Sequence, residues 1–90
     1  GRLQVYPSPL RPGETATVKA LTSGDAAGRL LVFDARGRTV RMLRPSSRNG
    51  TVTASWDGYD GRGEPAPAGV YFLRWEDGTR RASGKVLVTR

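Results

Sequence analysis

The acidic residues most suited to metal binding or catalysis lie together in one glycine-rich loop. Asp57, Asp60 and Glu64 occur within the sequence Asp-Gly-Tyr-Asp-Gly-Arg-Gly-Glu at 57–64. Carboxylates suit calcium, which takes about six to eight oxygen ligands, but the spacing differs from that of the common helix–loop–helix calcium motif. The other interpretation is a turn in which the Asp57 carboxylate accepts hydrogen bonds from nearby backbone amides. We expect the turn and keep these three residues as candidate metal ligands.

The sequence offers little for acid–base or nucleophilic catalysis. It contains no histidine and no cysteine, which removes disulfides, thiol nucleophiles, the usual zinc ligands and the best proton carrier near neutral pH. The serines have no histidine to activate them, and none stands in a Gly-x-Ser-x-Gly motif. We therefore predict no catalytic residue and no cofactor, and we do not expect an enzyme.

Basic residues are in excess. The net charge is +7, and clustered cations bind nucleic acids and acidic polysaccharides by releasing counterions. The arginines are spread along the whole chain, however, and the densest group is confined to 36–44. An accessory module that binds an anionic polymer is therefore the alternative function, while nucleic acid is not the expected partner. No apolar run approaches the roughly 20 residues of a membrane span.

The apolar residues predict a chain made of strands. Apolar and polar residues alternate in 3–6, 15–21 and 51–56, a continuous apolar run fills 30–33, and no segment shows a helical repeat. Seven strands are expected, at 3–6, 15–21, 29–34, 39–43, 51–56, 70–76 and 84–89, with 23–28 as a loop and 45–50 as a turn. Turns about every 8 to 12 residues are typical of a sandwich. We predict one all-β domain over 1–90, a seven-stranded antiparallel immunoglobulin-like β-sandwich rather than a closed barrel.

Aromatic residues mark the expected core. Trp56 ends the apolar side of its strand and precedes the Asp57-Gly58 turn, so we expect its ring to be buried between the sheets. We also predict a structural role for Tyr71. Because Tyr71 and Phe72 are neighbours in one strand, they face opposite sides, and the exposed one is the first place to look for a partner surface.

Three glycines are expected to shape the turns. Gly37 and Gly78 lie within the turn signals at 34–38 and 77–78, each of which predicts a β-hairpin, and we predict positive φ at both glycines. Gly69 stands where the long loop re-enters a strand, and there we expect it to relieve crowding.

Four segments, taken in order, resemble a known family. They are 32–41, Trp-Asp-Gly at 56–58, Gly-Val-Tyr-Phe-Leu-Arg at 69–74, and Lys-Val-Leu-Val at 85–88. This order resembles the Ig-like domain of flagellar hook-capping proteins and the related C-terminal sorting domains of type IX secretion cargo, over essentially the whole chain. In the opening segment 6–10, Ser8 and Leu10 replace the asparagine and phenylalanine of the family's Asn-Pro-Phe turn.

The resemblance implies a noncatalytic structural or targeting module of an exported bacterial protein. Such a module is expected to be secreted, extracellular or at the cell surface, and to act either as a C-terminal sorting or attachment domain or as a self-assembling subunit. Its partner is then secretion or surface machinery, or copies of itself. The end of the sequence directly after the last strand fits a natural C-terminus.

The outer strands are the expected contact points. Exposed strand edges can pair with another chain through backbone bonds. We therefore predict partner-binding residues in the last strand and the first, with Val86 and Val88 facing the core. The candidates are Lys85, Leu87, Arg90, Leu3 and Val5.

Overall fold

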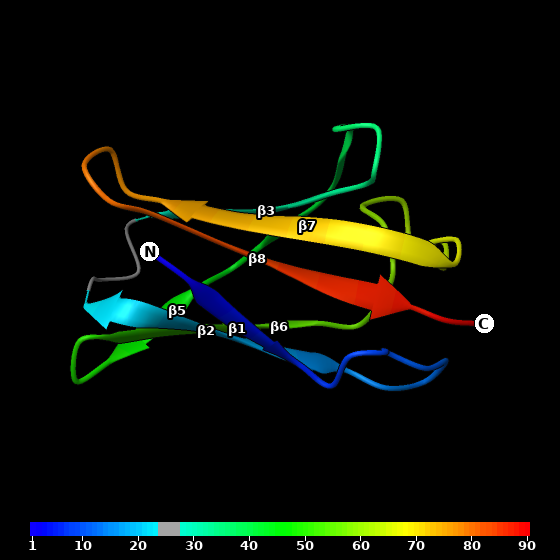
Figure 1. Ribbon diagram of the computed structural model, residues 1–90, viewed down its shortest axis with the longest axis horizontal. Coiled ribbons are helices and arrows are strands. Elements are labelled where there is room, and N and C mark those ends of the chain that lie inside the picture. Colours follow the sequence, from blue (N-terminus) through cyan, green and yellow to red (C-terminus); the bar gives the residue numbers. More distant parts are fainter. Residues whose placement is uncertain (24–27) are drawn as a thin grey trace.

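The computed structural model describes residues 1–23 and 28–90, and in this part of the chain two antiparallel sheets form a sandwich (Figure 1). The strands are β1 (Leu3–Tyr6), β2 (Ala16–Ser23), β3 (Arg29–Phe33), β4 (Thr39–Leu43), β5 (Ser46–Arg48), β6 (Thr51–Trp56), β7 (Gly69–Glu76) and β8 (Arg81–Val88). One sheet has the order β1-β2-β6-β5 and the other β4-β3-β7-β8. The all-β class is thus confirmed. None of the described residues lies in a helix that could cross a membrane.

The predicted number of strands was wrong, because the described residues form eight rather than seven. The additional strand is β5, which pairs with β6 through Ser46↔Thr53, Ser47↔Val52 and Arg48↔Thr51. All three residues of β5 are polar and exposed, so no alternation of apolar residues marks it. The connection at 49–50 is an Asn-Gly hairpin turn, with φ of 54° and 78° at its two residues.

Two predicted strand boundaries moved by more than one residue. Ser23 belongs to β2, whereas residues 24–27 of the predicted loop lie outside the described part of the chain. The last strand begins at Arg81 rather than at residue 84, so the β7–β8 turn occupies 77–80.

Aromatic and aliphatic side chains fill the space between the sheets. The burial of Trp56 is confirmed, since its exposed fraction is 0%. Its indole Nε1 donates to the carbonyl oxygen of Tyr59 at 2.9 Å, and its ring lies 5.4 Å from that of Tyr71. Tyr71 is 4% exposed and its hydroxyl donates to the carbonyl oxygen of Pro67, while neighbouring Phe72 points outward. Burial raises the pKa of the Tyr71 hydroxyl.

The predicted hairpin glycines adopt positive φ. Gly37 has φ of 84° and Gly78 has φ of 97°. In the β3–β4 turn, Asp34 Oδ1 accepts hydrogen bonds from the backbone amides of Arg36 at 2.9 Å and Arg38 at 3.0 Å. For Gly69 the predicted reason was wrong: a Cβ there meets no atom within 4 Å. Its φ of 152° makes glycine favourable at this position.

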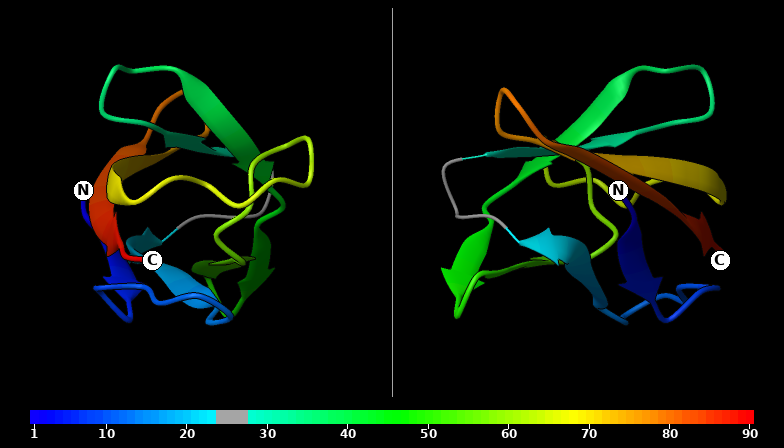
Figure 2. Two further views of the ribbon diagram at one scale, coloured as in Figure 1. Left: turned by 90° about the vertical axis from the view of Figure 1, so that its right-hand side faces the viewer. Right: turned by 60° about the vertical axis from the view of Figure 1, so that its left-hand side comes forward.

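The sandwich closes along one side, where β1 and β8 adjoin (Figure 2). These strands are the edges of different sheets. Parallel bridges join Arg2 to Ser83 and Leu10 to Val88. Gly84 permits this approach, because a Cβ at that position would lie 2.7 Å from the carbonyl oxygen of Leu3. The chain therefore brings its first and last strands together.

Candidate functional site

The acidic loop is built as a series of turns. Asp57 Oδ1 accepts hydrogen bonds from the Tyr59 amide and from Arg41 Nη1, both at 3.0 Å, which confirms the predicted turn at Asp57. Asp60 Oδ1 accepts from the amides of Arg62 at 2.9 Å and Glu64 at 3.0 Å. The Glu64 amide in particular holds the pKa of Asp60 below its usual range. These carboxylates therefore bind donors of the protein itself.

The structure does not gather the acidic residues into a metal site. Among the described residues, no three acidic, histidine or cysteine side chains are placed to hold one cation. Instead, the loop lies against the edge of β4, where the Gly61 amide donates to the carbonyl oxygen of Val40 at 2.9 Å. Arg41 also donates from Nη1 to the carbonyl oxygen of Tyr59 at 2.9 Å. The loop thus protects a sheet edge.

Arg90, expected to contact a partner, is engaged by its own chain. Its Nε donates to the carbonyl oxygen of Ala66 at 3.0 Å, and its Nη2 to those of Ala66 and Gly58. The planar guanidinium fits this arrangement of two oxygens. Its guanidinium is thus already bound within the protein, where it ties Arg90 to the long loop, although the residue itself stays exposed.

The edge of β8 was also expected to be available for backbone pairing, and this was wrong for much of its length. The Leu87 amide donates to Ser8 Oγ at 3.1 Å, and its carbonyl oxygen accepts from the Leu10 amide at 2.7 Å. Near the other end, the Ser83 amide donates to the carbonyl oxygen of Gly1 at 3.3 Å. The opening segment thus occupies the position that an added strand would take.

The five candidate partner residues differ in how far their side chains are exposed. Leu3 is 4% exposed and belongs to the core, so its side chain is not part of the surface, and Val5 is half-buried. The side chains of Lys85 and Leu87 are exposed. Val86 and Val88 are buried, which confirms the predicted alternation along β8.

The outer face of the β4-β3-β7-β8 sheet carries several exposed apolar side chains. Val70 pairs with Leu87, and Phe72 pairs with both Phe33 and Lys85. Val70, Phe72 and Leu87 are between 39% and 44% exposed, and Met42 on β4 is 62% exposed. We call Phe33, Met42, Val70, Phe72 and Leu87 the apolar face. The sequence pointed to one exposed aromatic next to Tyr71, but only the strand register shows that it has apolar neighbours.

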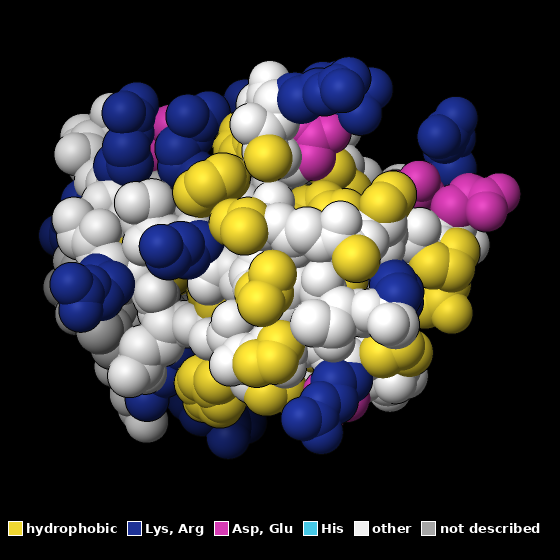
Figure 3. All heavy atoms as spheres, turned by 45° about the vertical axis from the view of Figure 1, so that its right-hand side comes forward, with side chains coloured by type: hydrophobic (Ala, Val, Ile, Leu, Met, Phe, Trp, Pro, Cys, Tyr) yellow, Lys and Arg dark blue, Asp and Glu magenta, His cyan; other side chains and the backbone are white. Residues whose placement is uncertain are grey.

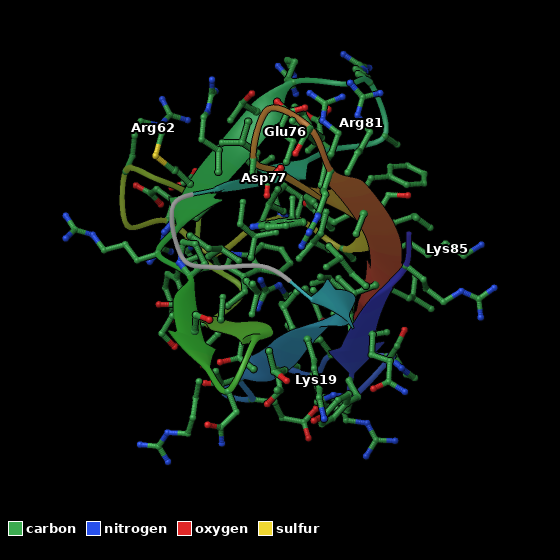
Figure 4. All side chains as sticks on the ribbon, turned by 90° about the vertical axis from the view of Figure 1, so that its left-hand side faces the viewer. Lys19, Arg62, Glu76, Asp77, Arg81 and Lys85 are labelled. Carbon is green, nitrogen blue, oxygen red and sulfur yellow. The ribbon has the colours of Figure 1, made fainter. Side chains whose placement is uncertain are left out.

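Basic side chains surround the molecule instead of forming one patch. On the face drawn in Figure 3, hydrophobic side chains gather in the middle and most lysines and arginines lie around the perimeter. Figure 4 shows Lys19, Arg62 and Lys85 on three different sides. Several arginines are also paired, as Arg38 is with Asp34 at 2.9 Å and Arg41 with Asp57 at 3.0 Å. This distribution gives little support to an electrostatic site for an anionic polymer.

Two solved structures share this fold. One is PorZ, an essential bacterial surface component of the type IX secretion system of Porphyromonas gingivalis, with a TM-score of 0.73 and 24% identity over 98% of this chain. The other is dimeric latent PorU from Porphyromonas gingivalis, with a TM-score of 0.68 and 20% identity over 97% of this chain. The present chain spans only 11% and 9% of these two proteins.

The family comparison is more direct. No curated protein is significantly similar in sequence. The FlgD Ig-like domain family matches residues 8–81, a range that includes strands β2 to β7 and the long loop. With two antiparallel sheets in an Ig-like sandwich and a match over most of its length, the chain belongs to the family of the FlgD Ig-like domain.

Proposed function

We propose that this domain is a noncatalytic structural or targeting module of an exported bacterial protein, located outside the cell or at its surface. The observation that carries the proposal is the recurrence of the same sandwich as about a tenth of PorZ and PorU. A module of this size within a long protein is suited to attachment or recognition, which use its surface and need no reactive group. The absence of histidine and cysteine from the sequence agrees with this role.

Of the two versions of this function, a sorting or attachment domain is better supported than a self-assembling subunit. The apolar face provides a surface for a protein partner. Two copies of a chain with net charge +7 repel each other, which opposes association through like surfaces. The proposed partner is therefore a component of secretion or surface machinery.

An export assay tests the proposal. The domain is fused to the C-terminus of a reporter with a signal peptide and expressed in a bacterium with a type IX system and in a mutant lacking it. We expect the reporter at the cell surface only when the system is present. An unrelated immunoglobulin-like sandwich in the same fusion is the control. A folded fusion that stays in the periplasm of both strains would contradict the targeting role.

Light scattering at increasing concentration separates the two versions. A sorting or attachment domain is expected to stay monomeric. If the apparent molecular mass rises with concentration to that of a dimer or a larger species, the self-assembling subunit is the better description.

A further inference from the structure

A hollow adjoins the apolar face where β1 approaches β7 and β8. Its lining includes Val5 from β1, Phe33 from β3 and Phe72 from β7. The two phenylalanines are register partners and project on the outer side of the sheet. Two rings and an aliphatic side chain form a surface that apolar groups of a ligand can cover.

Cations surround this hollow. Arg2, Arg74 and Lys85 contribute to its lining, and the described lining residues include no aspartate or glutamate. The Arg74 guanidinium lies over the Phe33 ring, 4.8 Å from its centroid, which fixes the cation beside the apolar surface. Its Nε is buried without a hydrogen-bond partner and lies 3.9 Å from the nearest Glu76 oxygen. A donor without an acceptor therefore stands next to the hollow.

We propose that the hollow and the adjoining apolar face bind an extended segment of a partner protein that presents both apolar side chains and carboxylates on the side facing the sheet. The apolar side chains of such a segment would cover Phe33 and Phe72, and its carboxylates would pair with Arg74 and Lys85. Because every second side chain of an extended peptide points to the same side, the apolar residues and carboxylates that face the sheet would stand two positions apart in the partner. This inference rests on the proposed function, since it names the chemistry of the partner.

Side chains, rather than backbone pairing, must carry this recognition. At the β8 edge, Leu87 bonds to Ser8 and Leu10, and Ser83 bonds to Gly1. A partner that added a strand to these positions would have to displace the protein's own opening segment. The outer face needs no such rearrangement, because Phe72, Leu87 and Lys85 already point outward.

A second copy of the chain fits the surface poorly. In a symmetric pair the same patch occupies both sides of the interface, so the cations Arg74 and Lys85 of one copy would meet a patch whose described lining holds cations and no carboxylate. Like charges brought together in this way oppose association. Acidic residues in the partner remove the conflict and account for the excess of cations around the hollow.

The test is a titration of the isotope-labelled full chain, followed by NMR, with a synthetic peptide in which every second residue is in turn phenylalanine, glutamate, leucine and glutamate, with threonines between them. We expect shifts concentrated at Phe33, Phe72, Arg74 and Ser83. Lys85→Glu should weaken the affinity about tenfold, as the loss of one close charge pair does. Lys19→Glu is the matched control: the same change at an exposed residue of the other sheet, which should leave the affinity nearly unchanged.

A second variant, a serine-substituted peptide and a DNA oligonucleotide test whether apolar contacts contribute to binding. Phe72→Ser, with an unchanged melting temperature, should weaken binding by a similar factor, and so should a peptide with serine in place of its apolar residues. Equal affinity for that serine peptide or for a DNA oligonucleotide would overturn the apolar part of the inference. Equal effects of Lys85→Glu and Lys19→Glu, or shifts that appear on concentration without peptide, would overturn it entirely.

The binding test and the export assay test different claims, so a negative result in one does not decide the other. Export that depends on the type IX system together with no peptide binding refutes only this inference. Peptide binding at the hollow without export refutes the targeting role and leaves the binding surface in place.

Discussion

Arg90 and Ala66 are joined by two hydrogen bonds from one guanidinium to one carbonyl oxygen, although 24 residues separate them. The same group reaches the carbonyl oxygen of Gly58 at 3.2 Å. Gly58 and Ala66 are themselves linked, because the Ala66 amide donates to the Gly58 oxygen at 2.9 Å. The end of the chain thus holds both ends of the glycine-rich loop.

Arg90→Gln should loosen this loop. Hydrogen bonds from charged groups contribute more than neutral ones, and because Arg90 is partly exposed we expect a loss of about 1 kcal/mol in the free energy of unfolding. Hydrogen exchange at the Ala66 amide should become faster. Arg90→Lys should restore little, since an ammonium lacks the planar fork. Exchange that is equally fast in Arg44→Gln would contradict the assignment.

Trp56→Ala should destabilise the domain strongly. The side chain is fully buried, and emptying a large aromatic site costs about 3 to 5 kcal/mol. Urea unfolding measures the loss, and Phe72→Ala is the control because that ring points outward. In a Trp75→Phe background, red-shifted fluorescence that is open to quenchers would show that Trp56 is not buried.

Gly37→Val and Gly78→Val should each cost about 1 to 2 kcal/mol, because a side chain with a Cβ is strained at positive φ. A Cβ meets no atom within 4 Å at either position, so the cost comes from the backbone and not from a clash. Gly37→Asn should cost less, since asparagine tolerates this region. Thermal unfolding compares them with Ala35→Ser, and equal shifts for valine and asparagine would remove the backbone explanation.

Stability should fall in acid. Backbone amides hold the pKa values of Asp34, Asp60 and Asp77 below their ordinary value of 3.8, chiefly those of Arg38, Glu64 and Arg80. A carboxyl whose folded pKa is lowered stabilises the protein above its unfolded pKa, and this contribution is lost as the pH falls through the folded pKa. Unfolding free energies measured by urea should therefore be level at pH values above the unfolded pKa of 3.8 and decline as the pH falls below it.

Asp60→Asn separates the charge of this group from its hydrogen bonds. Asparagine keeps an acceptor oxygen for the amides of Arg62 and Glu64 but does not titrate. The acid decline should be shallower in this variant. If it is as steep as in the unchanged protein, Asp60 is not one of the groups responsible.

Local patterns predicted much of the sandwich. The alternation that ends at Trp56 predicted a buried ring, and the turn signal at 34–38 predicted the β3–β4 hairpin, because both depend on residues close together in the chain. β5 could not be found in this way, since Ser46–Arg48 buries no side chain and follows only from its pairing with β6.

The candidate site was harder to predict because it depends on contacts between distant segments. Leu3 and Arg90 were assigned to a partner surface from their places in outer strands. Leu3 is instead covered where β1 meets β8, and Arg90 reaches the long loop. Neither contact can be predicted from the residues next to Leu3 or Arg90 in the sequence. The apolar face was only partly visible, because its members come from four strands whose register no single segment specifies.

The parallel contact between β1 and β8 has a mechanical consequence. Both strands run in the same direction, and the ends of the chain lie toward opposite ends of the long axis (Figure 1). A pull on the two ends therefore loads the bonds at Arg2–Ser83 and Leu10–Val88 in shear, so that they resist together instead of opening one after another. A domain pulled at these two points can bear tension along its length.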